Sequence, residues 1–189
     1  MESDFYKNKH TVDKYIRMAK DHDGTEIIQI LKPYLKPKAT VLEIGSGPGS
    51  DFEILRKDHS VVGSDYSQEF VTRLKMLFPE DTFLELDAIT LKTNMVFDVI
   101  YSNKVLHHLT DEELKHSIVS QSEILNGHGI ICHSFWKGNG TENFNGMFVN
   151  NHTEDRLRHF FEPYFKILLL KRYKEFEEGD SLLLIAQKK

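Results

Sequence analysis

The stretch that decides the fold is VLEIGSGPG, residues 41–49 of this 189-residue chain. The segment VLEI has the character of a strand, and it runs into a turn with glycines at 45, 47 and 49. Because glycine has no Cβ atom, the backbone can turn sharply there and approach a ligand closely. In an open parallel sheet, ligands bind in the crevice beyond the carboxyl ends of the strands. The loop is therefore the first candidate for a binding site.

Around this loop, short apolar runs alternate with segments of helical period. The runs cover residues 40–44, 60–64, 82–86, 97–102 and 129–134. Ser67 is expected to cap one intervening helix, and TDEE at 110–113 has the form of a capping box for another. Strand, helix and strand in this order predict right-handed crossovers and a parallel sheet covered on both faces.

The C-terminal end breaks the alternation. After a predicted helix at 153–161, apolar runs at 166–173 and 182–187 are joined by EEGD at 177–180, with no helix between them. They predict an antiparallel hairpin at the edge of the sheet. We therefore expect an α/β fold, doubly wound, with a mostly parallel seven-stranded sheet, a C-terminal antiparallel hairpin and three α/β/α layers.

The N-terminal end is expected to be helical. Residues 11–20 and 25–35 predict two helices, and Pro37 separates them from the rest. The length of 189 residues fits a single domain, 1–189, with 1–37 as a helical lid segment and 38–189 as a Rossmann-like core.

The glycine loop discriminates between two kinds of ligand. A dinucleotide fingerprint has the form G-x-G-x-x-G, with pyrophosphate on the helix N-terminus. Here Ser50 stands at the position of the third glycine, and Glu43 precedes the first glycine by two positions. A carboxylate at that position repels pyrophosphate and can pair with the ammonium of an amino-acid moiety. The loop therefore points away from a phosphate ligand.

With this acidic residue, the loop resembles the first motif of the class I S-adenosylmethionine-dependent methyltransferases, and residues 38–189 resemble the family in the order and spacing of later segments. The resemblance implies S-adenosylmethionine as cofactor and S-adenosylhomocysteine as product. It implies that the methionine end of the cofactor is held by Glu43 and by the loop residues Gly45, Ser46, Gly47 and Gly49. A plain tight turn is the alternative for the glycines.

Acidic residues also follow the next two predicted strands. Asp65 ends the second strand, where a carboxylate can accept hydrogen bonds from both ribose hydroxyls. The resemblance makes it the ribose ligand and places Tyr66 against adenine. After the third strand, the resemblance implies that Asp87 accepts from the adenine amino group, with the backbone of Ala88 and Ile89 at the ring. Capping or turn roles are the alternatives for both aspartates.

The end of the fourth strand is where cofactor and acceptor should meet, and it carries Ser102 and Asn103. His107 and His108 follow. Adjacent histidines point in different directions and no further ligands stand at useful spacing, so no metal is predicted. A packing role is expected for at least one histidine, and His107 is the candidate catalytic base. From the N-terminal segment, Tyr15 is predicted to face the cofactor.

The acceptor is expected to be a small molecule. The net charge is −5 and the Lys and Arg residues are scattered, which disfavours a nucleic-acid partner. The Asn/Asp-Pro-Pro-aromatic stretch of amino-methylating nucleic-acid and protein enzymes is absent after residue 102, and the single cysteine, Cys132, lies within a predicted strand rather than at a nucleophile position. An RNA- or protein-modifying enzyme and a non-catalytic cofactor-binding module remain open alternatives.

The aromatic residues of the segment 135–152 are expected to form part of the acceptor wall or, alternatively, to cover the sheet edge. They are accompanied by one methionine, and the set is Phe135, Trp136, Phe144, Met147 and Phe148.

The remaining expectations concern location and assembly. The N-terminus lacks the basic and apolar regions of a signal peptide, and no apolar run approaches the roughly 20 residues that span a bilayer. We therefore expect a cytoplasmic protein without a membrane partner, as a monomer or weak homodimer.

Overall fold

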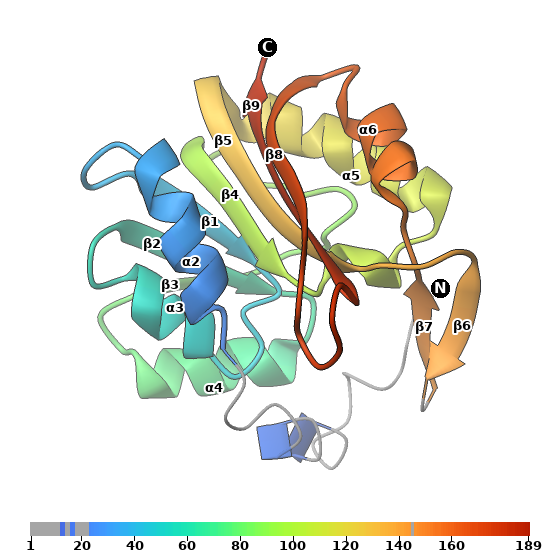
Figure 1. Cartoon of the computed structure of the whole chain (residues 1–189). Helices are drawn as coiled ribbons and strands as arrows, with labels where there is room; N and C mark the ends of the chain where they lie inside the picture. Colours follow the sequence, from blue (N-terminus) through green and yellow to red (C-terminus); the bar gives the residue numbers. More distant parts are fainter. Residues whose placement is uncertain (1–11, 14–15, 18–22, 145) are drawn as a thin grey trace.

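The computed structural model describes residues 12–13, 16–17, 23–144 and 146–189 (Figure 1). Its centre is a seven-stranded sheet of order β3-β2-β1-β4-β5-β9-β8. The strands are β1 (Thr40–Ile44), β2 (Ser60–Asp65), β3 (Thr82–Glu85), β4 (Phe97–Asn103), β5 (Leu125–Trp136), β8 (Phe165–Tyr173) and β9 (Ser181–Lys188). The pairs from β3 to β5 are parallel, and β9 runs antiparallel to both of its neighbours. The predicted sheet and its C-terminal hairpin are confirmed.

Helices cover both faces of this sheet. They are α2 (Thr25–Leu31), α3 (Ser50–Leu55), α4 (Gln68–Leu77), α5 (Asp111–Ile124) and α6 (Glu154–Phe161), with short 3-10 turns η2 (Lys32–Tyr34) and η3 (Leu106–His108). In Figure 1, α2, α3 and α4 lie on one side of the sheet and α5 and α6 on the other. None of the helices in the described ranges has the length and apolar character needed to cross a membrane.

Two hydrophobic cores follow from the alternation of side chains along the strands. In β1, Val41 belongs to the core under α2, α3 and α4, whereas Leu42 belongs to the core under α5 and α6. Phe52 of α3 and Ile118 of α5 are fully buried in these two cores. Burial of each such side chain stabilises the fold by about 1.5–3 kcal/mol. The three-layer prediction is therefore confirmed.

Local capping fixes where the helices begin. The Ser67 hydroxyl accepts from the backbone N–H of Phe70 at 3.4 Å. At the start of α5, the Thr110 hydroxyl accepts from the Glu113 N–H, and the Glu113 carboxylate accepts from the Thr110 N–H at 2.8 Å. Both predicted caps are confirmed, and both place their helix start at the carboxyl edge of the parallel strands.

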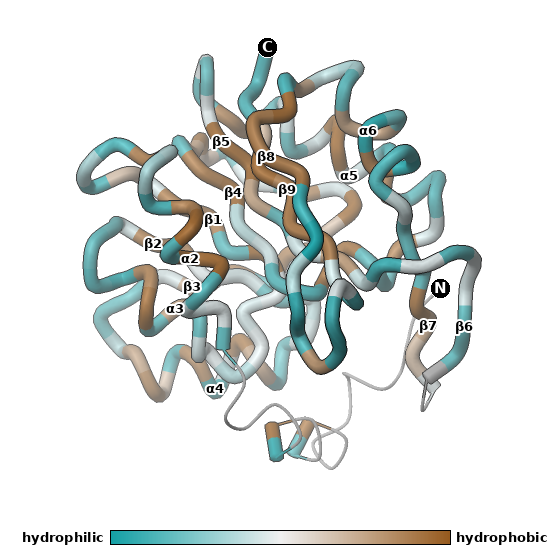
Figure 2. Tube along the Cα trace, in the orientation of Figure 1, coloured by the Kyte–Doolittle hydropathy of each residue, from teal (hydrophilic) through white to brown (hydrophobic). Residues whose placement is uncertain are grey.

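Two features differ from the sequence-based expectations or lie beyond them. The predicted helix at 11–20 falls mainly outside the described residues. Within the segment 135–152, a small antiparallel hairpin forms a second sheet from β6 (Thr141–Phe144) and β7 (Met147–Asn150). Figure 2 shows β6 as mainly hydrophilic and β7 as more hydrophobic. This difference fits a hairpin that turns one strand toward solvent and the other toward the body of the protein.

Candidate active site

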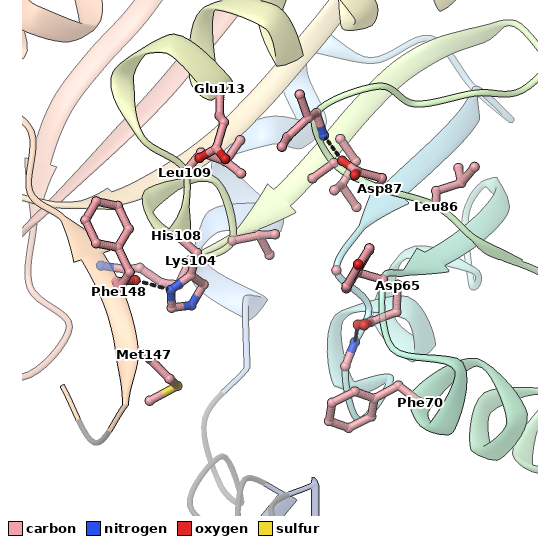
Figure 3. Close-up of a pocket in the computed structure, with 17 residues that line it drawn as sticks. Asp65, Phe70, Leu86, Asp87, Lys104, His108, Leu109, Glu113, Met147 and Phe148 are labelled. Atoms are coloured by element: carbon pink, nitrogen blue, oxygen red, sulfur yellow. Dashed lines mark hydrogen bonds between the residues drawn. The ribbon is translucent and has the colours of Figure 1, made fainter. Parts of the chain in front are cut away.

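A pocket of about 360 Å³ lies at the carboxyl edge of the parallel strands (Figure 3). It is bounded by the glycine loop, by the ends of β2 and β3, by the β4–α5 connection and by β7. The predicted cofactor residues that line it are Gly45, Gly47, Asp65, Tyr66, Asp87, Ala88 and Ile89. The sequence therefore identified one continuous wall of this pocket.

The loop glycines are required by backbone geometry. Gly45, Gly47 and Gly49 all have positive φ, at 70°, 48° and 92°. A Cβ on Gly45 would lie 2.5 Å from a methyl of Val105, and one on Gly49 would lie 2.7 Å from Leu74. Because a larger residue would be both strained and crowded, these positions specify glycine. Gly49 immediately precedes α3 and does not line the pocket.

Asp65 joins the end of β2 to the glycine loop. Its carboxylate accepts from the Gly47 N–H at 2.9 Å and from the Ser67 N–H at 2.8 Å. Burial raises the pKa of Asp65 to about 6, against the opposing effect of these backbone donors. A carboxylate has about four lone-pair sites, so Asp65 can accept further hydrogen bonds from the pocket side.

Glu43 lies behind the loop rather than on the pocket wall. It is 3% exposed, and one carboxylate oxygen accepts from the Ser46 hydroxyl at 2.6 Å. Burial, followed by the charges of Asp51 and Asp65, raises the pKa of Glu43 to about 8. The contact with a cofactor ammonium, predicted for Glu43, stays a prediction, as does the contact of Ser46.

Asp51, the second residue of α3, was not singled out from the sequence. Its carboxylate accepts from the Gly24 N–H at 2.6 Å, the Tyr101 hydroxyl at 2.7 Å and the Asn103 amide at 3.1 Å. A Cβ on Gly24 would overlap this group. Asn103 also accepts from the Ser134 hydroxyl at 2.6 Å. Asn103 therefore anchors α3 to β4 and β5 and lies outside the pocket lining.

The loop after β3 is held by α5. Asp87 accepts from the Ile89 N–H at 2.6 Å, so this N–H is committed within the loop. The carbonyl of Ala88 accepts from the Ser117 hydroxyl at 2.6 Å, and that of Ile89 accepts from the Ser120 hydroxyl at 2.9 Å. The position of the predicted adenine loop thus depends on two serines of α5.

Ser102 begins a buried chain of hydrogen bonds that ends at the same loop. Its hydroxyl lies 2.8 Å from His133 Nδ1, and His133 Nε2 lies 2.8 Å from Gln121 Oε1. The Gln121 amide donates to Ser117 at 3.1 Å, and Ser117 donates to the Ala88 carbonyl. Because Gln121 Oε1 only accepts, His133 carries its proton on Nε2 and Ser102 donates to Nδ1. Burial lowers the pKa of His133 to about 3, so the ring is neutral.

The sequence analysis missed most of this chain. It did not single out Ser117 or Gln121, which are both completely buried in the structure. The usable signal was that Ser117 and Gln121 are four residues apart and so share one face of the helix. Ser102 itself is fully buried and does not line the pocket.

The two adjacent histidines differ in their surroundings. The ring of His107 is buried, and its Nδ1 has no hydrogen-bond partner within the described part of the chain. Burial, with the charges of His108 and Lys104, holds its pKa well below the usual value. His108 lines the pocket, and its Nδ1 lies 2.7 Å from the Phe148 carbonyl oxygen. The two rings nevertheless lie against each other, with centroids 4.1 Å apart.

The prediction that His107 is the catalytic base is therefore untested, but the geometry presents His108 to the pocket in its place. In the described ranges, no three His, Cys, Asp or Glu side chains gather in a way that could hold a metal ion. The expected absence of a metal stays a prediction. Tyr15 lies outside the described residues. Near it in sequence, Asp13 pairs with Arg73 of α4 at 2.7 Å.

The aromatic segment divides between two roles. Met147 and Phe148 of β7 line the pocket, as an acceptor wall would require. Phe135 is fully buried in the core, and Trp136 is not among the lining residues. Instead, Trp136 stacks on Phe176 at 5.8 Å and lies under the Lys104 ammonium at 3.3 Å from the ring centroid. Trp136 thus fits the alternative expectation, that aromatic residues of this segment cover the sheet edge, because β5 continues through it and pairs it with Ser181.

Comparison with known proteins concerns these same segments. A family model described as a methyltransferase domain matches residues 41–129. An uncharacterized methyltransferase of Bacillus cytotoxicus is 32% identical over 129 residues, which are 65% of this chain and 60% of that protein. The trans-aconitate 2-methyltransferase of Yersinia pestis is 33% identical over 85 residues, 43% of this chain and 33% of that protein. The chain thus spans less than two thirds of the length of these relatives.

A solved structure aligns with a larger part of this chain than these relatives do. The crystal structure of the 1,6-didemethyltoxoflavin-N1-methyltransferase of Burkholderia thailandensis holds 1,6-didemethyltoxoflavin and S-adenosylhomocysteine. It aligns with a TM-score of 0.79 over 93% of this chain and 82% of its own, at 19% identity. At this identity, the similarity shows a common fold alone.

Proposed function

This chain belongs to the class I S-adenosylmethionine-dependent methyltransferases, and from that premise we propose that it methylates a small-molecule acceptor by direct in-line transfer from S-adenosylmethionine. The observation that carries the proposal is the joining of the glycine loop, Asp65 and Asp87 along one wall of one pocket. These groups match, in order, the methionine, ribose and adenine portions of the cofactor. When bound, the cofactor supplies an activated methyl group on a cationic sulfur.

The electrostatics of the pocket fit such a ligand. Glu43 is buried with its pKa raised to about 8, and its carboxylate neighbours are Asp51 and Asp65. A ligand that brings an ammonium and a sulfonium would favour the ionised carboxylates, because opposite charges in a poorly solvated site interact strongly. A dinucleotide would bring negative phosphates to the same place.

In this proposal the protein acts mainly by placement. The glycine loop and Asp65 hold one end of the cofactor, while β7 and the β4–α5 connection form the opposite wall for the acceptor. Alignment of the nucleophile with the methyl group and the leaving sulfur can supply most of the acceleration of a methyl transfer. Asp87 and Ala88, steadied by α5, would orient the adenine.

Two observations support a small-molecule acceptor. Among the described lining residues the one cationic side chain is Lys104, so the pocket offers no basic track for a nucleic acid. The Burkholderia thailandensis neighbour is named as the N1-methyltransferase of 1,6-didemethyltoxoflavin. A methyltransferase of RNA or protein and a non-catalytic binding module are the competing functions.

We further propose that residues 1–189 act as one domain. Of the predicted lid segment 1–37, only the part before α2 is proposed as a lid over the cofactor, because α2 itself packs in the core on one face of the sheet. The ion pair between Asp13 and Arg73 supports this, since it ties a described part of the segment to α4, next to the pocket residue Phe70. Removal of residues 1–22 is expected to leave a folded core with weaker binding of S-adenosylhomocysteine.

Calorimetry and a transfer assay test the function. S-adenosylhomocysteine should bind at neutral pH, Asp65→Ala should weaken it, and the control Asp58→Ala, at an exposed ion pair, should not. Comparable binding of NAD would refute the cofactor assignment. With methyl-labelled S-adenosylmethionine, label should enter the small-molecule fraction of a cell extract. Label confined to RNA or protein would favour the second function, and binding without transfer would favour the third.

A further inference from the structure

The peptide group between Ala88 and Ile89 is held at both of its polar atoms. Its carbonyl oxygen accepts from the Ser117 hydroxyl at 2.6 Å, and its N–H donates to one carboxylate oxygen of Asp87 at 2.6 Å. Because a peptide group is planar, a bond that fixes the carbonyl also fixes the direction of the N–H. Figure 3 shows the Asp87 carboxylate on the pocket wall with this second bond dashed. A hydroxyl of α5 therefore places a pocket carboxylate through one rigid group.

The Ser117 hydroxyl has a single hydrogen, and the amide of Gln121 decides where that hydrogen goes. Two oxygens 2.6 Å apart need a hydrogen between them, so the hydroxyl donates to the Ala88 carbonyl. The Gln121 amide nitrogen donates to the hydroxyl oxygen at 3.1 Å, and both side chains are fully buried. With the amide reversed, its oxygen would face the hydroxyl and compete for the same hydrogen. The orientation of this amide thus controls the hold on Ala88.

His133 of β5 sets the orientation of the amide. Its Nε2 lies 2.8 Å from Gln121 Oε1, and its Nδ1 lies 2.8 Å from the hydroxyl of Ser102 at the end of β4. The Gln121 nitrogen already faces Ser117, so the ring must carry its hydrogen on Nε2 and the Ser102 hydroxyl must donate to Nδ1. Burial lowers the pKa of His133 to about 3, so the neutral ring keeps this hydrogen at pH 7.

The hydrogen bonds in this chain all run in one direction. Each group from Ser102 to the Ala88–Ile89 peptide accepts from the group before it or begins the chain, and donates to the group after it. Bonds aligned head to tail in a buried site polarise and strengthen one another. The chain ends on the Asp87 carboxylate, whose remaining lone pairs can accept from a ligand in the pocket.

We propose that His133 is a positioning residue, which acts through α5 to hold the Asp87 carboxylate where it accepts a hydrogen bond from the amino group of the bound adenine. This inference rests on the proposed function, in which Asp87 faces adenine. A purine with a carbonyl oxygen in place of that amino group would bring a second acceptor to the carboxylate. The buried chain therefore selects for a cofactor with an amino donor, a role distinct from stabilising the core.

Calorimetric titrations of the full chain test the inference. The first measures binding of S-adenosylhomocysteine. The next two compare 5′-methylthioadenosine with 5′-methylthioinosine, which carries a carbonyl oxygen where the adenosine compound has its amino group. We expect the wild type to bind the adenosine compound about tenfold or more tightly. This ratio reports the placement of Asp87, because a loss of stability alone leaves the preference of the folded protein unchanged.

Ser117→Ala removes the donor to the Ala88 carbonyl and should reduce the preference to about twofold or less. Ser122→Ala is the matched control on the same helix. The Ser122 hydroxyl donates to the Val119 carbonyl within α5 at 2.7 Å and is not part of the chain, so this variant should keep the wild-type preference.

Two substitutions of His133 assign its role. His133→Gln offers an amide N–H in place of Nε2 and should keep most of the preference, whereas His133→Met offers no donor and should lose it. His116→Met, on the exposed face of α5, is the control and should keep it. Nitrogen NMR of the wild type adds a measurement that needs no variant. It should find the His133 hydrogen on Nε2, with no titration between about pH 5 and pH 8.

The outcomes separate this inference from the proposed function. Equal binding of the two nucleosides by the wild type, an undiminished preference in Ser117→Ala, or a His133 hydrogen on Nδ1 would overturn the inference while S-adenosylhomocysteine still binds. The same holds if His133→Met keeps the preference or His133→Gln loses it. Failure of S-adenosylhomocysteine to bind in the first titration would refute the proposed function, and this inference with it.

Discussion

Replacing Glu43 with glutamine should stabilise the free protein at high pH and weaken its binding of S-adenosylhomocysteine. Glu43 is 3% exposed, and burial with two neighbouring carboxylates raises its pKa from an ordinary 4.5 to about 8. The unfolded chain therefore releases this proton at a lower pH than the folded chain does. Glutamine keeps the shape and an oxygen for the Ser46 hydroxyl but has no proton to lose.

The magnitude follows from linkage between protonation and folding. Between about pH 4.5 and pH 8 the folded state holds one more proton at Glu43, so the free energy of unfolding falls as pH rises, by up to about 1.4 kcal/mol per pH unit. Over the whole window this amounts to about 5 kcal/mol at most. Glu43→Gln lacks this contribution. Its stability relative to the wild type should be near parity at pH 5 and greater by several kcal/mol at about pH 8.

Urea unfolding at a series of pH values between about 5 and 8 measures this difference directly. Glu53→Gln is the matched control, because Glu53 is exposed on α3 and should leave the pH dependence unchanged. Calorimetry with S-adenosylhomocysteine should show weaker binding by Glu43→Gln. Binding to the wild type should release a proton, since the ligand ammonium favours the ionised carboxylate.

Parallel loss of stability in the wild type and Glu43→Gln across this pH range would show that Glu43 is not held protonated. Unchanged ligand affinity in the variant would show that the ammonium lies elsewhere. The two results are independent, because the first concerns the free protein and the second the complex.

Three other substitutions have defined outcomes. Gly45→Ala should lower the melting temperature by several degrees and the free energy of unfolding by about 1–3 kcal/mol, because φ is 70° and a Cβ would lie 2.5 Å from Val105. Gly127→Ala is the control, since no atom lies within 4 Å of a Cβ added there. Ser117→Ala should weaken S-adenosylhomocysteine binding about tenfold by releasing the Ala88 carbonyl, and calorimetry showing no change would separate the buried chain from binding. Asp98→Asn should destabilise the protein at pH 7 by about 1–2 kcal/mol, and the difference should shrink progressively as the pH falls below 3.8, the ordinary pKa of aspartate, since hydrogen bonds from Lys36 and Thr40 outweigh burial and lower the pKa of Asp98. A difference that did not shrink with falling pH in urea unfolding would contradict this.

The sequence predicted what depends on local pattern. The strands follow from apolar runs of the right length, and α4 and α5 begin at Ser67 and Thr110 because capping involves residues only three positions apart. The glycine loop was recognisable because positive φ and close packing restrict its positions to glycine. Asp65 and Asp87 follow from their place at strand ends.

The remainder depends on contacts between distant segments. Which of His107 and His108 lines the pocket depends on how η3 packs, and the proton state of Glu43 depends first on burial and then on the charge of Asp51. The chain from Ser102 through His133 to α5 joins residues on β4, β5 and a helix. No local pattern in the sequence encodes such pairings, so they required the structure.

The β6–β7 hairpin has a consequence for how acceptor specificity can diverge. Among the residues that the structure describes, its two strands pair only with each other, and its contacts with the body of the protein include His108 with the Phe148 carbonyl and Asn150 with the Leu109 carbonyl. The ladder of the seven-stranded sheet does not run through it. Exchange of this short segment can therefore alter the substrate while the glycine loop and its buried acids stay intact. In the proposed function, mutations in this hairpin would change the acceptor wall and leave the residues proposed to bind the methyl donor in place.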